Sequence, residues 1–117
     1  MDNGDNRILA NGSTCGATDN PCCTTVPVFA IDELAKTAII SFRRTIASSK
    51  YSEWGGDASV LANGNLEYDL CASPTEISTE VDEITMGSSP QVVWSMSEAH
   101  ENFYRANRLP SLYPGVQ

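Results

Sequence analysis

The sequence predicts an α+β fold, a mainly antiparallel sheet with two helices in a single small domain. Three observations predict it. A length of 117 residues suits one domain. Apolar residues recur at three- and four-residue steps in 31–48 and 98–108, which is typical of helices. Between these segments lie short apolar runs separated by turn residues, as in strands. We expect residues 1–25 to form a flexible N-terminal arm and 26–117 to form the domain.

The N-terminal arm is rich in Asn, Gly, Ser, Thr and Asp and shows no hydrophobic period. It holds Cys15, Cys22 and Cys23, whose spacing matches no standard zinc pattern. Free thiols are the preferred interpretation. A disulfide from Cys15 to Cys22 or Cys23, and a metal site, remain alternatives. Cys71 follows an apolar strand pattern and is expected to be buried.

The first predicted helix spans residues 31–48. Asp32 is its expected N-cap, and Arg43 and Arg44 lie towards its C-terminal end, where cations suit the helix dipole. Its apolar stripe consists of Leu34, Ala35, Ala38, Ile39, Phe42 and Ile46.

A strand region follows the glycine pair Gly55-Gly56, which breaks helices and lets two backbones approach closely. Residues 58–62 and 66–71 flank Asn63-Gly64, a strong hairpin signal. Alternation of Leu66, Tyr68 and Leu70 with acids predicts one buried face and one wet face.

The remaining segments, from residue 77 to residue 108, carry both strand and helix signals. Residues 77–85 are either a strand with a bulge or a short helix, and 91–96 form a buried strand. Ser95-x-x-Glu98 has the form of a capping box, so 98–108 are expected to be the second helix, which Leu109-Pro110 ends.

Acidic residues outnumber basic ones by fifteen to seven, for a net charge of −8. No Lys or Arg occurs between Tyr51 and Tyr104. Binding to phosphates or to an anionic membrane needs clustered cations, so nucleic acid and membrane are both disfavoured partners. The acids either keep the protein soluble or form a patch for a basic partner. Because there is neither a secretory signal nor a long apolar run, we expect a cytoplasmic protein.

Catalytic candidates are few. His100 is the one histidine, and a general base needs a nucleophile or carboxylate nearby. Glu53, Ser95, Ser97 and His100 could form a hydrolase-like site only if folding brings them together. We expect no metal and no cofactor.

One family resemblance rests on Phe29-Ala30-x-Asp32-Glu33-Leu34-Ala35, Ser52-Glu53-Trp54-Gly55-Gly56, the Asn63-Gly64 hairpin, Ser73-Pro74 and Val92-Val93-Trp94. This order resembles the JAB/JAMM (MPN-like) metallopeptidases over residues 28–100, and most of all their DUF4329-type branch, in which a helix precedes a strand that starts with Glu-x-Gly-Gly. The resemblance implies a zinc bound by His-x-His and a downstream Asp, with Glu53 as the general base. Ser95-Met96-Ser97 stands where His-x-His is expected, and no Asp follows Asp82. The resemblance therefore implies a degenerate, metal-free member.

The leading functional hypothesis is a non-catalytic protein-binding module, with another protein or a second copy as its partner. Unpaired sheet edges favour a dimer. The predicted contact residues are Trp54, Gly55, Gly56, Glu67 and Asp69, although Trp54 and Trp94 are also natural core residues. The alternatives are the small hydrolase, which requires its side chains to converge in a pocket, and an acidic inhibitor or immunity-type protein, which requires a continuous negative face.

Overall fold

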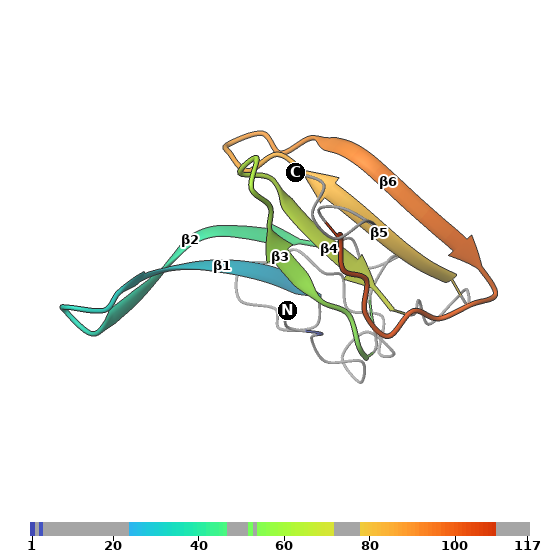
Figure 1. Ribbon diagram of the computed structural model, residues 1–117, viewed down its shortest axis with the longest axis horizontal. Helices are drawn as coiled ribbons and strands as arrows, with labels where there is room; N and C mark the ends of the chain where they lie inside the picture. The colour runs from blue at the N-terminus through green and yellow to red at the C-terminus, as the bar shows by residue number, and fades with distance from the viewer. Residues whose placement is uncertain (2, 4–23, 47–51, 53, 72–77, 110–117) are drawn as a thin grey trace, which may run out of the picture.

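The computed structural model describes residues 1, 3, 24–46, 52, 54–71 and 78–109, which form an all-β protein (Figure 1). The predicted α+β class with two helices is wrong, because the described residues contain no helix. The N-terminal arm lies almost wholly outside them. One sheet is a two-stranded hairpin and the other is antiparallel with the order β3-β4-β5-β6. The strands are β1 (Thr25–Asp32), β2 (Thr37–Thr45), β3 (Ala58–Val60), β4 (Leu66–Leu70), β5 (Ser78–Ile84) and β6 (Val92–Ala99).

The segment predicted as the first helix is mostly a β-hairpin. Residues 31 and 32 end β1, residues 33–36 form the turn, and β2 follows. The apolar spacing fitted a helix, but Thr37, Ile39, Ile40 and Thr45 are β-branched and favour strands. β1 itself is the apolar run 25–32, with which β2 pairs antiparallel. Pairing between β1 and β2 therefore decided the structure of this segment, although its apolar residues do recur with the period of a helix.

The second predicted helix is also absent. Residues 98 and 99 complete β6, and residues 101–109 form an extended segment, here called the strap. Long-range bonds hold the strap: the Gly56 amide donates to the Tyr104 carbonyl at 3.1 Å, and Arg108 pairs with two acids of the sheet. A local capping pattern cannot report such distant partners.

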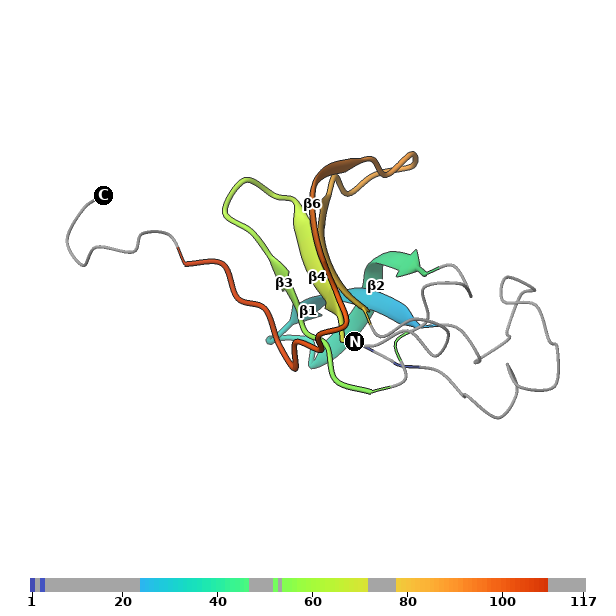
Figure 2. The ribbon, with the colours of Figure 1, turned by 90° about the vertical axis from the view of Figure 1, so that its right-hand side faces the viewer.

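The hairpin around Asn63-Gly64 is confirmed, with β3 and β4 on its two sides. Gly64 has a φ of 82°, which this turn requires. The wet face predicted for β4 is wrong, because all five of its residues are buried. The two central strands of the four-stranded sheet, β4 and β5, are covered on one face by the base of the β1–β2 hairpin and on the other by the strap (Figure 2).

The apolar core lies between the hairpin base and one sheet face. It consists of Val26, Ile46, Leu66, Tyr68, Leu70 and Ile84, with Val28, Phe42, Ala58 and Met86 packed against it. Cys71 is fully buried, as predicted. Of the two alternatives for residues 77–85, a strand or a short helix, the strand is correct. Its pairing register is irregular between Glu83 and Ile84. The strand predicted at 91–96 exists, but it is exposed rather than buried.

Candidate functional site

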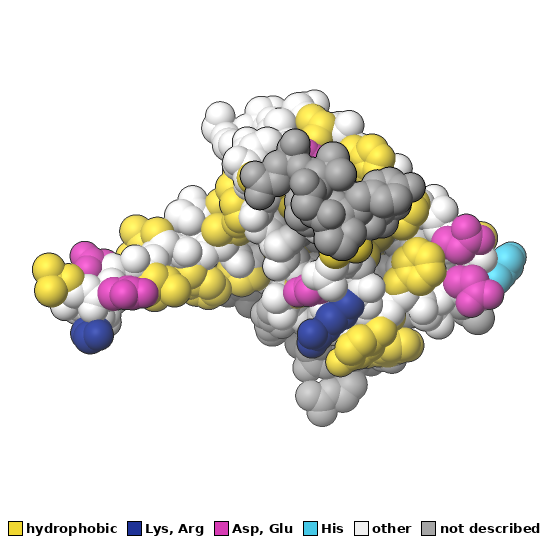
Figure 3. Space-filling view, in the orientation of Figure 1, with side chains coloured by type: hydrophobic (Ala, Val, Ile, Leu, Met, Phe, Trp, Pro, Cys, Tyr) yellow, Lys and Arg dark blue, Asp and Glu magenta, His cyan; other side chains and the backbone are white. Residues whose placement is uncertain are grey.

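The outer part of the β1–β2 hairpin projects from the molecule without cover (Figure 3). Every residue from Phe29 to Ser41 is exposed. Five of them are large apolar side chains: Phe29, Ile31, Leu34, Ile39 and Ile40. An isolated two-stranded hairpin is at best marginally stable in water, so this apolar surface is unusual for a chain that acts alone.

The strand register gathers four apolar side chains on one face of the hairpin. Phe29 pairs with Ile40, and Ile31 pairs with Ala38. Directly opposed residues of an antiparallel pair share a face. We call Phe29, Ile31, Ala38 and Ile40 the apolar hairpin face. Three of them are 52%, 72% and 44% exposed, for Phe29, Ile31 and Ile40 respectively.

A β-bulge creates this face. The register shifts between Val28 and Phe29, because Val28 pairs with Phe42 whereas Phe29 pairs with Ile40. Ser41 is the extra residue, and its hydroxyl donates to the Val28 carbonyl at 3.1 Å. An extra residue reverses which side chains point to which face. Ile40 therefore leaves the core side of the hairpin, where Phe42 lies, and joins Phe29.

The tip of the hairpin is a tight turn ordered by Asp32. Its Oδ1 accepts hydrogen bonds from the Leu34 and Ala35 amides at 2.9 and 2.8 Å. These are the hydrogen bonds that a helix N-cap residue makes. The capping role predicted for the Asp32 side chain is therefore correct, but the element that it orders is a hairpin turn rather than a helix. Lys36 has a φ of 56°, which turns the chain back. Leu34 is 95% exposed at this tip.

A second apolar surface lies along β6, at the edge of the four-stranded sheet opposite to β3. All eight residues of β6 are exposed. Its large apolar side chains are Val92, Val93, Trp94 and Met96, each 43–52% exposed. Trp94 is therefore not a core residue, although the sequence also allowed that interpretation.

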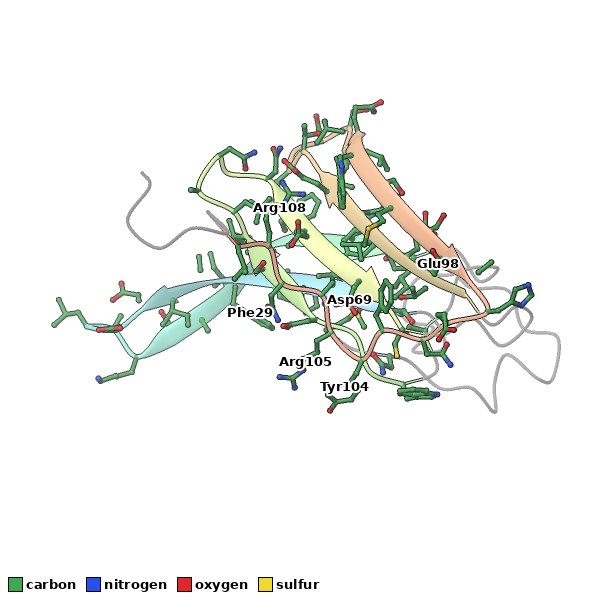
Figure 4. All side chains as sticks on the ribbon, turned by 45° about the vertical axis from the view of Figure 1, so that its right-hand side comes forward. Phe29, Asp69, Glu98, Tyr104, Arg105 and Arg108 are labelled. Atoms are coloured by element: carbon green, nitrogen blue, oxygen red, sulfur yellow. The ribbon has the colours of Figure 1, made fainter. Side chains whose placement is uncertain are left out.

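The strap is fixed to the sheet by Arg108. Glu67 and Glu83 stand directly opposite each other on β4 and β5. The Arg108 guanidinium binds both, with N–O distances of 2.8 Å to Glu67 and 2.5 Å to Glu83, and it lies 5.0 Å from the Trp94 ring centre. Figure 4 shows Arg108 reaching the sheet, whereas Tyr104 and Arg105 point outward.

The Glu83 carboxylate has further partners on the β3–β4 turn. The side-chain amides of Asn65 and Asn63 donate to its Oε1 at 2.6 and 2.9 Å. Together with Arg108, these bonds lower the pKa of Glu83 to about 2. The cluster thus joins the turn, two strands and the strap. It also offsets the electrostatic repulsion between the facing carboxylates of Glu67 and Glu83.

A cavity of about 370 Å³ lies between β2 and the core-facing side of β4, β5 and β6. Its lining residues are Arg44, Ile46, Tyr68, Leu70, Glu80, Asp82, Val92 and Ser95. The Tyr68 hydroxyl donates to Asp82 Oδ2 at 2.9 Å. Burial, followed by the Asp82 charge, raises the pKa of Tyr68. Asp82 Oδ1 and Arg44 Nε are buried without a hydrogen-bond partner among the described residues.

The predicted contact residues divide into two groups. Trp54 is 47% exposed and available for contact. Gly55 and Gly56 have φ values of 68° and 88°, and a Cβ on Gly56 would lie 2.7 Å from the Asp69 carbonyl, so they serve close backbone packing. Glu67 and Asp69 are 4% and 1% exposed.

Asp69 is held beneath the strap (Figure 4). Its Oδ1 accepts a hydrogen bond from the Asp57 amide at 2.5 Å. Burial raises the pKa of the Asp69 carboxyl, although backbone groups of Asp57 and Ala106 oppose this change. Neither Asp69 nor Glu67 presents an open acidic surface.

The catalytic candidates are spread along β6. Ser95 lines the cavity with Tyr68 and Asp82, whereas Ser97 and His100 are not among its lining residues. His100 is exposed at the end of the molecule opposite to the hairpin tip (Figure 3). Glu53 lies outside the described residues. Of the four residues that the hydrolase hypothesis names, Ser95 is therefore the one that the structure places at the cavity.

No group of three or more potential metal ligands occurs among the residues that the structure describes. In the same residues, no helix is long and apolar enough to cross a membrane. Comparison with known proteins finds no matching family model, curated protein or solved structure.

Sequence reasoning missed the apolar hairpin face because it predicted a helix over residues 31–48, whose apolar stripe included Ala38 but not Phe29, Ile31 or Ile40. The signal was present as the β-rich composition of 25–32 and 37–46, where Val, Ile, Thr and Phe dominate. The bulge that brings Ile40 beside Phe29 has no comparable signal, because its register depends on pairing.

Proposed function

We propose that this chain is a non-catalytic protein-binding module whose binding element is the β1–β2 hairpin, and that its partner is a second copy of the chain. The observation that carries the proposal is the apolar hairpin face, which lies beyond the core on a hairpin without cover. Burying such side chains is worth about 25 cal/mol per Å² of apolar surface.

The distribution of the acids supports this proposal over the acidic-inhibitor alternative. Glu67, Asp69, Asp82 and Glu83 are buried within the four-stranded sheet. A buried carboxylate cannot meet a basic partner without the loss of its present contacts. The hairpin face, in contrast, is open and uncharged, which is how the centre of a protein interface is built.

The test replaces the apolar hairpin face and measures molar mass in solution. The double variant Ile31→Ser/Ile40→Ser removes two exposed side chains that make no part of the core. We expect the wild-type chain to sediment as more than a monomer at micromolar concentration and the variant to shift towards the monomer. Its thermal unfolding midpoint should change little.

Val60→Ser is the matched control, because Val60 is also an exposed aliphatic residue of a strand, at 51% exposure, but lies on β3. It should assemble as the wild type does. A wild-type monomer at every accessible concentration, or equal assembly by the hairpin variant, would overturn the proposal.

A further inference from the structure

We propose that β6 pairs antiparallel with β6 of a second copy, with a two-fold axis at Ser95, so that two four-stranded sheets become one sheet of eight strands. This inference shares with the proposed function the idea that the partner is a second copy, but it uses a different surface. It rests on the edge, charge pattern and side-chain order of β6.

β6 is the least protected strand edge of the described residues. In an antiparallel pair with β5, every second residue of β6 turns its N–H and C=O outward. Proteins guard such edges with short strands, proline, β-bulges or charged side chains, above all lysine. β3 has only three residues, β1 contains Pro27, and β2 carries Arg43 and Arg44. β6 has eight residues and neither proline nor a cationic side chain, and its bulge at Val93 and its one charged residue, Glu98, lie towards its two ends, so that residues 94–97 carry no such protection.

Charge favours the antiparallel direction. Glu98 is the single charged residue of β6, near its C-terminal end, and the chain as a whole carries −8. A parallel, in-register pair would place Glu98 beside its own copy, which is unfavourable. An antiparallel pair places the two Glu98 side chains at opposite ends of the contact.

Side-chain size selects the register. With the axis at Ser95, Trp94 of each copy stands opposite Met96 of the other, and Val93 stands opposite Ser97. Trp94 and Met96 are 43% and 44% exposed in the single chain. Thioether–aromatic contacts and cross-strand aromatic pairs are both favourable. An axis at Met96 would instead oppose Trp94 to Glu98.

The experiment is disulfide trapping in the full chain with Ser95→Cys and, as a control, Ser97→Cys. Both serines are exposed on the same strand face, two residues apart. At the axis, opposed Cα atoms lie about 4.5–5.5 Å apart, which a disulfide spans. Two copies of residue 97 would lie about 13 Å apart, beyond disulfide reach.

Under mild oxidation, Ser95→Cys should give a dimer in which the residue 93–97 peptide is linked to itself, and Ser97→Cys should give little. Peptide mass mapping separates this link from any formed by the four native cysteines. Equal trapping by both variants would indicate parallel pairing or random collision. Either that result or no self-link at Ser95→Cys would overturn the inference.

A charge placed on the edge gives an independent test. Met96→Lys should abolish the β6 contact, whereas Val60→Lys, on the short edge strand β3, should not. Circular dichroism confirms that both variants are folded. If trapping fails while the hairpin variant still loses mass, this inference falls and the proposed function stands. If trapping succeeds while the hairpin variant assembles normally, the proposed function falls and this inference stands.

Discussion

Arg108 makes it possible for two carboxylates to face each other inside the sheet. Glu67 and Glu83 are directly opposed across β4 and β5, an arrangement that would be destabilising by itself. The guanidinium binds both acids, and Asn65 and Asn63 bind Glu83 from the turn. The side chain of Arg108 thus links the strap to both central strands of the sheet.

Replacement of Arg108 should alter acid stability. In the wild type, Asn65, Asn63 and Arg108 lower the pKa of Glu83 from 4.5 to about 2. Its stabilising contribution is therefore complete above about pH 4.5 and is lost as the pH falls towards 2. In Arg108→Gln that pKa rises towards 4.5, so the stabilising contribution of Glu83 is smaller and its loss is complete at a higher pH, which makes the decline in stability at acid pH shallower.

Thermal unfolding midpoints between pH 2 and pH 7 measure this effect. Arg105→Gln is the control, because Arg105 carries the same charge on the same strap but lies over the exposed Tyr104 ring, 5.3 Å from its centre. Coincident acid profiles for Arg108→Gln and the wild type would show that the cluster does not hold the strap.

Gly56 should be far less tolerant of substitution than Gly64. Both have φ values above 80°, but a Cβ at Gly56 would lie 2.7 Å from the Asp69 carbonyl, and one at Gly64 meets nothing within 4 Å. We expect Gly64→Ala to cost about 1 kcal/mol of unfolding free energy from its backbone conformation alone. Gly56→Ala should cost about 3 kcal/mol, because steric overlap adds to the same strain. Denaturant unfolding measures both, and equal losses would contradict the packing seen at Gly56.

Among the elements, local signals predicted the strands of the larger sheet but not the β1–β2 hairpin or the strap. The Asn63-Gly64 hairpin and the strand at 91–96 followed from residues close in sequence. The two helices were wrong because β1 and β2 hold each other, and the strap is held by Gly56, Glu67 and Glu83. Partners that are distant in sequence leave no periodic pattern, so neither the strap nor the covering of both sheet faces could be predicted.

Asp32 should control the order of the hairpin tip without controlling global stability. Asp32→Ala removes the acceptor for the Leu34 and Ala35 amides, a type of bond worth about 1 kcal/mol. Hydrogen exchange over residues 33–37 should become faster, while the unfolding midpoint stays close to that of the wild type. Asp32→Asn retains an acceptor oxygen and should exchange slowly. Unchanged exchange in Asp32→Ala would mean that the tip is ordered by another contact.

At the scale of the whole molecule, two apolar surfaces occur on a chain of charge −8. The net charge follows from the sequence, which also predicted a single domain from the chain length and self-association through unpaired sheet edges. The sequence did not locate either surface, because exposure depends on how the strands pack. β6 was expected to be buried for its apolar run, but it lies at the edge of the sheet.

Salt should strengthen self-association. Two copies that each carry −8 repel each other, and added salt screens this repulsion while apolar contacts remain. Sedimentation at 50 mM and 500 mM sodium chloride should show a larger assembled fraction at the higher concentration. Dissociation by salt would indicate that ion pairs, rather than the hairpin face or β6, join the copies.

Hydroxyl-radical footprinting of the wild-type chain over a dilution series shows whether a second copy covers the hairpin, because it reads the exposure of individual side chains. Leu34, Ile31 and Phe29 are 95%, 72% and 52% exposed in the single chain. If the hairpin binds a second copy, their labelling falls as concentration rises, while that of Val60 stays constant. Labelling of the hairpin that does not change with concentration would rule out self-association through the hairpin.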